Sequence, residues 1–223
     1  MVYYMPLVVM VSIQVIIYKM KVTVIIPFNK DRGYLKHAID SVMNQTYKNI
    51  ELILCKSKDG VSKNINKGFE YATGDVVGYF AEDDLLCPKT IEHVVNGIGD
   101  YDFIHGKAIR FDKETNVVYD PSTRYPTLRD LVKHNFIHGG TCWYKSHVIK
   151  ENRFDESLWT AEEYEYHLRL LSKGYEIGFI DEVIFKYRLH QNQKSIGNLD
   201  KYYQQKRNNV KQLIKNKYVV KNY

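Results

Sequence analysis

The sequence is poor in cysteine and proline and has no low-complexity segment. Its three cysteines, Cys55, Cys87 and Cys142, have no metal-binding spacing, and their odd number argues against a disulfide framework. This usage indicates a reducing compartment, so we expect a cytoplasmic protein. The first predicted strand, at residues 21–27, is followed by Phe-Asn-Lys-Asp at residues 28–31 and not by a glycine-rich phosphate loop. A nucleotidyltransferase with an α/β sheet usually carries such a loop after its first strand, so this class of enzyme is not expected.

Long apolar runs are also scarce. Residues 2–18 carry no charge, but Pro6, Ser12 and Gln14 dilute a stretch that sits at the short limit for a membrane span. No basic region precedes it and no small-residue cleavage site follows it, so a signal peptide is not expected. Three interpretations of residues 1–19 stay open: an upstream extension without structural role, a weak membrane anchor and an extra β-rich segment.

Acidic residues are outnumbered, with 26 Asp and Glu against 32 Lys and Arg, which gives a net charge of +6. This balance suits a partner that carries phosphates, such as a nucleotide, a nucleic acid or an anionic membrane. Part of the excess lies in the predicted helical tail at 199–223, either as a solvated helix face or as a peripheral membrane contact. We expect no nucleic acid partner, because the sequence shows no recognition motif of that kind.

The most informative stretch is residues 74–88, where an apolar strand runs directly into Glu82, Asp83 and Asp84. Carboxylates gathered at the end of a buried strand are costly unless a cation lies beside them. Oxygen ligands of this kind suit Mg²⁺ or Mn²⁺, and such an ion usually holds a phosphate as well. The alternative is an acidic turn that caps the helix expected after Pro88.

Predicted strands and helices alternate along the first half of the chain. Apolar runs predict strands at 21–27, 50–55 and 76–80, and helical spacing predicts helices at 34–44 and 62–72. Further strands are expected at 102–106, 141–144 and 176–189, a hairpin at 108–119, and helices at 90–98, 128–134, 146–151 and 162–172. This order predicts one α/β domain with a mostly parallel central sheet flanked by helices. Ligands of such sheets bind outside the carboxyl ends of the strands.

Several segments, taken in order, resemble the GT-A-fold glycosyltransferases of family 2, which are inverting enzymes that use nucleotide-sugars. The first segment is the apolar strand that closes with Pro27, Phe28 and Asn29. The others are Gln-Thr-Tyr at 45–47, Gly-Val-Ser at 60–62, Asn-Lys-Gly at 66–68, Ala-Thr-Gly-Asp at 72–75, Glu-Asp-Asp at 82–84, Phe-Asp-Glu at 154–156, Glu-Glu at 162–163 and Tyr-Arg-Leu-His at 187–190. The resemblance implies a single GT-A (Rossmann-like) domain at 20–198, between the extension 1–19 and the tail 199–223.

The resemblance further implies sugar transfer, with inversion, from a nucleotide-diphosphate sugar to a hydroxyl of a glycan, protein or lipid acceptor. A UDP-sugar is the donor expected for the family. The implied metal ligand for a divalent cation, Mn²⁺ or Mg²⁺, is Asp84, and His190 either reaches the metal or diphosphate or lies at the surface. The implied donor-binding residues are Pro27, Phe28, Asn29, Asp59, Asn66 and Asp83. Glu163, near the amino end of a predicted helix, is the candidate base that removes the acceptor's proton.

The sequence departs from the family pattern in three places. After the second strand, where the family usually carries Asp-Asp-Gly-Ser, it has Cys-Lys-Ser-Lys-Asp-Gly at 55–60, which leaves Asp59 to hold the base or ribose. The metal motif is Glu-Asp-Asp where the family usually has Asp-x-Asp-Asp, and Glu163 stands where the family usually has Asp. A non-catalytic nucleotide-sugar-binding module of the same fold therefore stays open. Residues 138–140 and Trp159 are candidates for the acceptor site.

Overall fold

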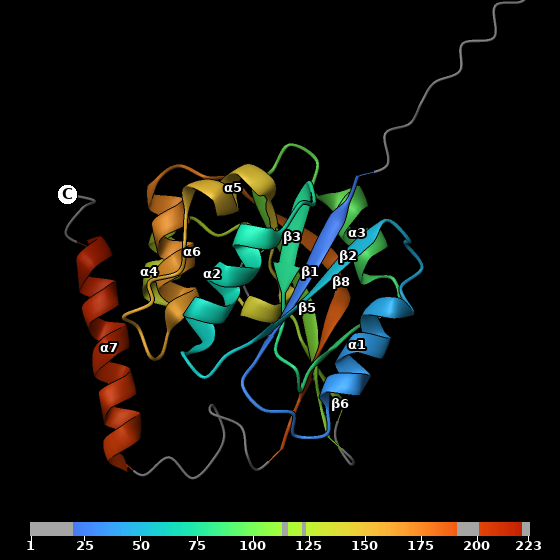
Figure 1. Ribbon diagram of the computed structural model, residues 1–223. Coiled ribbons are helices and arrows are strands. Elements are labelled where there is room, and N and C mark those ends of the chain that lie inside the picture. Colours follow the sequence, from blue (N-terminus) through green and yellow to red (C-terminus); the bar gives the residue numbers. More distant parts are fainter. Residues whose placement is uncertain (1–19, 113–115, 122–123, 191–200, 220–223) are drawn as a thin grey trace, which may run out of the picture.

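The first half of the chain forms the predicted alternation of parallel strands and helices. Its elements are β1 (Val22–Phe28), α1 (Leu35–Met43), β2 (Ile50–Lys56), α2 (Val61–Tyr71) and β3 (Val76–Tyr79). β1 lies between β2 and β3 and pairs with both in parallel (Figure 1). The chain crosses from β1 to β2 on one side and then back to β3 on the other. The carboxyl end of β1 is therefore a topological switch point, where α/β sheets bind ligands.

This computed structural model describes residues 20–112, 116–121, 124–190 and 201–219. The interpretations of the extension at residues 1–19 fall outside the described residues, so they stay predictions. Among the residues that are described, no helix is long and apolar enough to cross a membrane.

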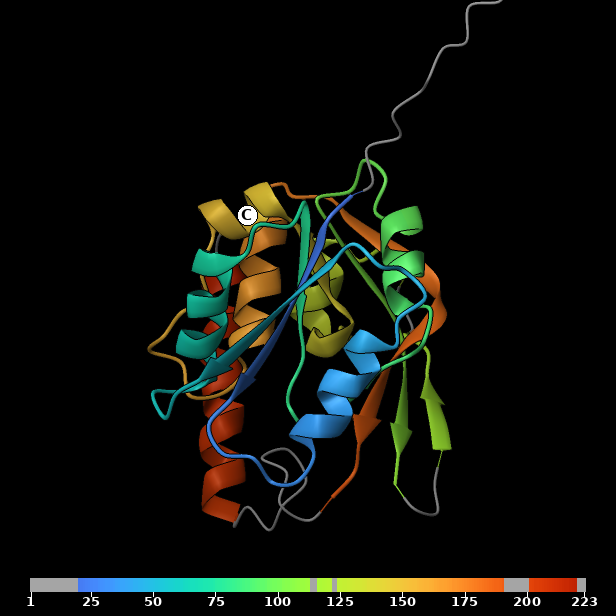
Figure 2. The same cartoon turned by 45° about the vertical axis from the view of Figure 1, so that its right-hand side comes forward.

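The second half of the chain makes the sheet mixed rather than mostly parallel. Its elements are β4 (Leu85–Leu86), α3 (Thr90–Gly97), β5 (Phe103–Phe111), β6 (Asn116–Tyr119), α4 (Leu128–Lys133), a 3₁₀ turn (Gly139–Thr141), β7 (Trp143–Lys145), α5 (Ser146–Glu151), α6 (Glu162–Ser172), β8 (Ile177–Arg188) and α7 (Lys201–Val219). The strand order is β2-β1-β3-β7-β5-β8-β4, with β6 on β5. β7 is antiparallel to both of its neighbours, whereas β5 and β8 are parallel. Figure 2 shows β5, β6 and β8 side by side at one edge.

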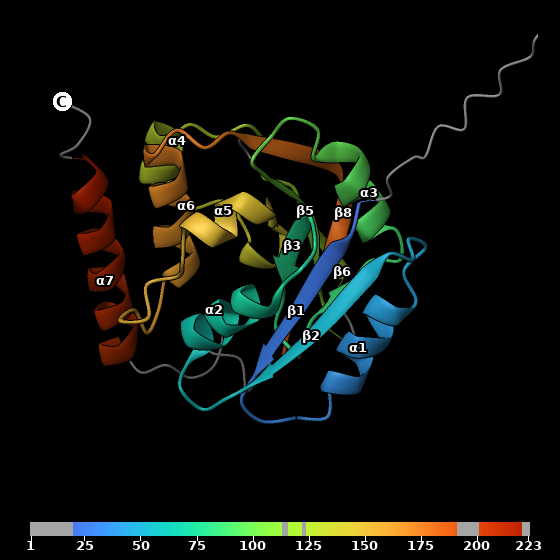
Figure 3. The ribbon, with the colours of Figure 1, turned by 45° about the horizontal axis from the view of Figure 1, so that its top comes forward.

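Alternation of side chains along β1 builds a core on each face of the sheet. Val24 and Ile26 pack with α1 and α3 on one face, whereas Ile25 packs with α2 on the other. Figure 3 shows α2, α5 and α6 on one side of β1 and β2, with α1 and α3 on the opposite side. Complete burial of each such aliphatic side chain contributes about 1.5–3 kcal/mol, so the strand is held from both faces.

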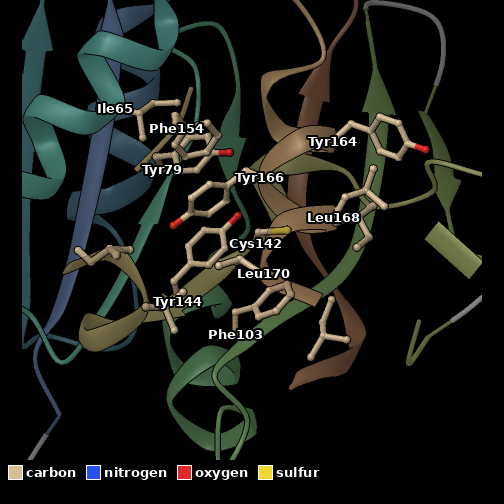
Figure 4. Packing of buried hydrophobic residues seen from close by; sticks show 14 of the residues in the cluster. Ile65, Tyr79, Phe103, Cys142, Tyr144, Phe154, Tyr164, Tyr166, Leu168 and Leu170 are labelled. Carbon is tan, nitrogen blue, oxygen red and sulfur yellow. The ribbon is translucent and has the colours of Figure 1, made fainter. Parts of the chain in front are cut away.

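Aromatic side chains fill the core between β3, β7 and α6 (Figure 4). The rings of Tyr79 and Tyr144 are parallel with centroids 6.5 Å apart, and Phe154 stacks on Tyr166 at 4.2 Å. Tyr166 lies on α6 and Tyr79 on β3, so this packing fixes the distance between the helix and the central strand. Residues at the start of α6 are thereby positioned relative to the acidic segment that follows β3.

Candidate functional site

A cleft of about 650 Å³ opens at the carboxyl ends of β1, β2 and β3. Its walls come from the loops after these strands, the start of α2, the segment before α6 and one face of α7. The structure brings most of the predicted site residues to this cleft: Pro27, Phe28, Asn29, Asp59, Asp83, Asp84 and Glu163. The predicted pocket at the switch point is thus formed, although its residues are scattered over the sequence.

The loops after β1 and β2 are tied together by the side chain of Asn64. Its amide donates hydrogen bonds to the carbonyl oxygens of Phe28 at 3.3 Å and Ser57 at 3.1 Å. Asp59 accepts a hydrogen bond from Ser57 Oγ at 2.6 Å and lines the cleft. The backbone on this side of the cleft is therefore held in place by α2.

The acids after β3 are buried and are met by an arginine from the loop after β1. Arg32 forms ion pairs with Glu82 at 2.7 Å and Asp83 at 3.6 Å. Burial raises the pKa of the Glu82 carboxyl, and the charge of Asp83 raises it further, whereas Arg32 lowers it. Arg32 therefore offsets part of the cost of gathering these carboxylates.

Asp84 is the most enclosed of the three acids, at 4 % exposure. Its Oδ1 accepts a hydrogen bond from the backbone N–H of Arg188 at 2.9 Å. Burial raises its pKa well above the usual range, and the charge of Asp83 raises it further. The excess negative charge here is the kind that a bound cation relieves.

His190 lies beside Asp83. The imidazole Nε2 is 2.9 Å from Asp83 Oδ2, and Arg188 Nε donates to the Asp83 carbonyl oxygen at 2.8 Å. His190 is not part of the cleft lining, and its ring packs beside that of Tyr34, with the centroids 5.2 Å apart. Within the part of the chain that is described, no three His, Cys, Asp or Glu side chains form a ready-made metal cage.

Glu163 lies in the first turn of α6, which also carries Glu162 and Glu165. The partial positive charge of a helix amino end favours ionised acids at this place. Ala161 directly before the helix has φ of 59°, the left-handed region that a non-glycine residue rarely adopts. This backbone turn brings the segment 156–161 along the cleft and directs α6 into it.

Two contacts fix the Glu163 carboxylate. The phenol of Tyr79 donates a hydrogen bond to Glu163 Oε1 at 3.3 Å. Burial raises the pKa of that phenol well above its usual value, so it remains a proton donor. Gly139 lies against the same carboxylate so closely that a Cβ on it would be 2.0 Å from the carboxyl carbon. The candidate base is therefore held on two sides.

Asn66, predicted to contact the donor, is turned away from the cleft. Its side-chain amide donates to the Phe154 carbonyl at 3.0 Å and to Glu156 Oε1 at 2.9 Å, and its carbonyl accepts from the Phe154 N–H at 2.8 Å. It is not among the cleft-lining residues. Its hydrogen bonds are used to hold the chain entering the 156–161 segment, so its role is to brace that wall.

Of the residues predicted for the acceptor site, one lines the cleft and the others do not. Trp159 lines the cleft. His138 instead packs in a half-buried position, with its ring 5.1 Å from that of Phe185 and 4.9 Å from that of Tyr187, and the 138–140 segment is not part of the lining. Its contribution to the site is the close contact between Gly139 and Glu163.

Sequence reasoning did not single out several residues of the site. Arg32 carries no local signal beyond its place after the Pro-Phe-Asn segment, and Tyr79 resembles an ordinary strand residue. Arg207 and Lys211 on α7 line the cleft as well, although the charge of the tail predicts a solvated or membrane-facing helix. These contacts depend on tertiary packing, which no local pattern encodes.

The model of the family described as glycosyl transferase family 2 matches residues 53–175, more than half of the chain. The chain belongs to glycosyl transferase family 2. The matched segment includes β3, the acidic cluster and the start of α6. The cleft residues that come from β1, the loop after it, β8 and α7 lie outside the match.

Relatives and solved structures agree with this assignment. An uncharacterized glycosyltransferase of Rickettsia typhi is 29 % identical over an alignment of 211 residues. The matched part covers 79 % of this chain and 66 % of that protein. The Staphylococcus aureus TarS fragment crystallised with UDP-GlcNAc has a TM-score of 0.66 at 17 % identity, covering 87 % of this chain and 65 % of its own. The mannosyltransferase PcManGT of Pyrobaculum calidifontis, in complex with GDP-Man and Mn²⁺, has a TM-score of 0.62 at 14 % identity, covering 93 % and 66 %. These likenesses confirm the predicted GT-A fold of this family 2 member.

Proposed function

We propose that this family 2 chain transfers a sugar from a nucleotide-diphosphate sugar, with UDP as the nucleotide, to a hydroxyl acceptor with inversion. The observation that carries the proposal is the arrangement of two groups of acids in one cleft. Asp83 and Asp84 lie at the end of β3, and Glu163 lies at the start of α6. The TarS neighbour is described with UDP-GlcNAc and supports the choice of UDP.

The donor's nucleotide would lie over the loops after β1 and β2. Phe28 offers an apolar surface there, and Asp59 offers a carboxylate that accepts hydrogen bonds from sugar hydroxyls. Asn64 fixes both loops before any ligand arrives, which limits the ordering cost of binding. Asp83 follows the carboxyl end of β3 and is, after Asp59, the second carboxylate that we propose for binding the ribose.

The carboxylate oxygens of the acidic cluster fit a divalent cation that is also bound by the diphosphate of the nucleotide-sugar. Mg²⁺ and similar ions are commonly held by one or two carboxylates plus substrate phosphates rather than by a complete protein cage. Asp84 supplies a buried oxygen ligand, with Asp83 and His190 beside it. When bound, the ion supplies charge stabilisation for the departing diphosphate. Arg32, paired with Glu82 and Asp83, contributes positive charge at the same wall.

Inversion requires a base on the face of the sugar opposite the leaving group. We assign this role to Glu163, whose carboxylate lines the same cleft from a separate element, α6. The acceptor hydroxyl gives its proton to Glu163 as its oxygen attacks the anomeric carbon and the bond to the diphosphate breaks. Tyr79 and Gly139 hold the carboxylate in place for this step, and well-oriented reacting groups account for a large share of catalytic power.

Release of nucleotide from the donor tests the proposal. The protein would be incubated with Mn²⁺ and one of four nucleotide-sugars at a time: UDP-GlcNAc, UDP-glucose, UDP-galactose or GDP-mannose. In this assay water replaces the acceptor as the nucleophile. We expect slow release of UDP from one UDP-sugar, and loss of that release in Glu163→Gln. Nucleotide binding without release above the Glu163→Gln level would instead support the non-catalytic binding module.

A further inference from the structure

The last helix of the described chain is packed firmly against the domain. Val210, Ile214 and Tyr218 of α7 join the core cluster that includes residues of α4 and α6. The Tyr218 phenol also donates a hydrogen bond to Glu165 Oε1 of α6 at 2.8 Å. Figure 1 shows α7 at the outer edge of this layer, beyond α2 and α6. These contacts hold α7 in a fixed position, where it forms one wall of the cleft.

Two cations of α7 line that cleft without an ion pair to any described carboxylate. Arg207 and Lys211 lie one helical turn apart, and both are partly buried and line the cleft. The structure gives neither of them an ion pair or hydrogen bond with any described residue, and the Nε atom of Arg207 is buried without a partner. Burial lowers the pKa of Lys211, and the charge of Arg207 lowers it further.

The proximity of Arg207 and Lys211 is electrostatically unfavourable when no ligand is bound. Like charges at i and i+4 on a helix repel each other, and partial burial removes some of the water that would screen them. A phosphate-class anion between the two side chains would reverse both effects, because arginine and lysine bind phosphates through charge-assisted hydrogen bonds.

We propose that Arg207 and Lys211 form a second anion site in the cleft, which takes a phosphate-class group of the substrate. α7 packs on α6, the helix that carries Glu163, whereas the nucleotide side of the cleft is built by the loops after β1 and β2. The acceptor approaches Glu163, so the anion belongs to the acceptor, which is then a phosphate-bearing molecule. This substrate role rests on the proposed function, whereas binding of a simple phosphate does not.

The test uses titrations of the full chain and of the double variant Arg207→Gln/Lys211→Gln. The matched control is Lys215→Gln, which removes a charge one turn further along α7 at a position outside the cleft lining. The first arm titrates inorganic phosphate and pyrophosphate into protein saturated with UDP and Mn²⁺. The second arm titrates UDP with Mn²⁺ alone. A third arm titrates phosphate into protein without nucleotide.

We expect phosphate and pyrophosphate to bind the wild type and Lys215→Gln beside UDP, and to bind the double variant at least tenfold more weakly, with UDP affinity unchanged. A tenfold loss of UDP affinity in the double variant, with no phosphate binding beside UDP, would identify the donor's diphosphate as the source of the anion. If the double variant binds every probe as the wild type does, the anion site is refuted. If the wild type binds no nucleotide but binds phosphate through this pair, the proposed donor function fails and the anion site stands.

Discussion

The carboxylate of Glu163 lies directly against the bare Cα of Gly139. A Cβ at residue 139 would come within 2.0 Å of the Glu163 carboxyl carbon and of its Oε1. Glycine is the residue type that leaves room for such a close approach. The 3₁₀ turn at Gly139–Thr141, which comes from a different part of the chain than α6, thereby sets the position of the proposed base.

Gly139→Ala tests this relationship. The added methyl group forces the Glu163 side chain to move, and displacement of a reacting group by about 1 Å can cost 100-fold in rate. We expect the rate of UDP release from the UDP-sugar to fall about 10- to 100-fold, with UDP affinity unchanged. Gly97→Ala is the control, because its Cβ would meet Ile180 Cγ1 at the milder distance of 3.3 Å. Equal loss of activity in both variants would remove the special role of Gly139.

Glu163→Gln tests the base itself. The amide keeps the size of the side chain but cannot accept the proton, and general base catalysis contributes about 10²–10⁴ in rate. We expect kcat for UDP release to fall by about this factor while UDP affinity, measured by calorimetry, stays within twofold. Glu70→Gln, an exposed acid on α2, should behave as the wild type. Full activity of Glu163→Gln would mean that another group removes the proton.

Tyr79→Phe tests how the base is tuned. The phenol donates a hydrogen bond to the ionised form of Glu163, so its removal destabilises the carboxylate and raises the pKa of the base. The acidic limb of the pH profile of kcat/KM should move to higher pH by about half to one unit. Tyr119→Phe removes a phenol that donates to the Phe136 carbonyl oxygen at 2.7 Å instead, and should leave the limb in place. An unmoved limb in Tyr79→Phe would show that the 3.3 Å contact has no effect on the base.

His167 predicts a loss of stability in acid. Burial lowers the pKa of its imidazole to about 3 in the folded chain, whereas an unfolded histidine titrates near pH 6.5. The unfolded state therefore binds a proton in this window that the folded state does not, and stability falls as pH falls from about 6.5, by about 1.4 kcal/mol per pH unit.

Urea unfolding at pH 7.5 and 5.5 measures this effect through His167→Gln. The stability gap between wild type and variant should shrink by about 1 kcal/mol at pH 5.5, because only the wild type loses this contribution. The comparison cancels the opposing effect of Asp84 and Glu82, whose raised pKa values act equally in both proteins. The exposed His37→Gln should show a gap that does not change with pH. A constant gap for His167→Gln would contradict the buried, neutral imidazole.

Much of the fold was predictable because its signals are local. The β-branched run before Phe28 and the helical spacing between residues 34 and 44 each identify an element without reference to the rest of the chain. The direction of β7 was not predictable, since a short strand fits a parallel or an antiparallel partner equally well. The mixed sheet follows from tertiary pairing of Trp143 and Tyr144 with β3 and β5.

The candidate site was predictable to the extent that its residues stand in motifs. Asp83, Asp84 and Glu163 were found in this way and do share a cleft. Asn66 was misplaced because a motif gives the position of a residue in the sequence and not the direction of its side chain. Arg207 and Tyr79 stand in no motif of the site, and only packing of α7 and β3 brings them to it.

The most direct test of the account is calorimetric titration of UDP, GDP and dTDP with Mn²⁺, repeated with a chelator and with Asp84→Asn. The exposed Asp100→Asn serves as the control. We expect UDP to bind the wild type and Asp100→Asn, and the chelator or Asp84→Asn to weaken binding at least tenfold. Absence of binding by all three nucleotides, or UDP binding that neither change affects, would contradict a metal-assisted nucleotide-sugar site in this cleft.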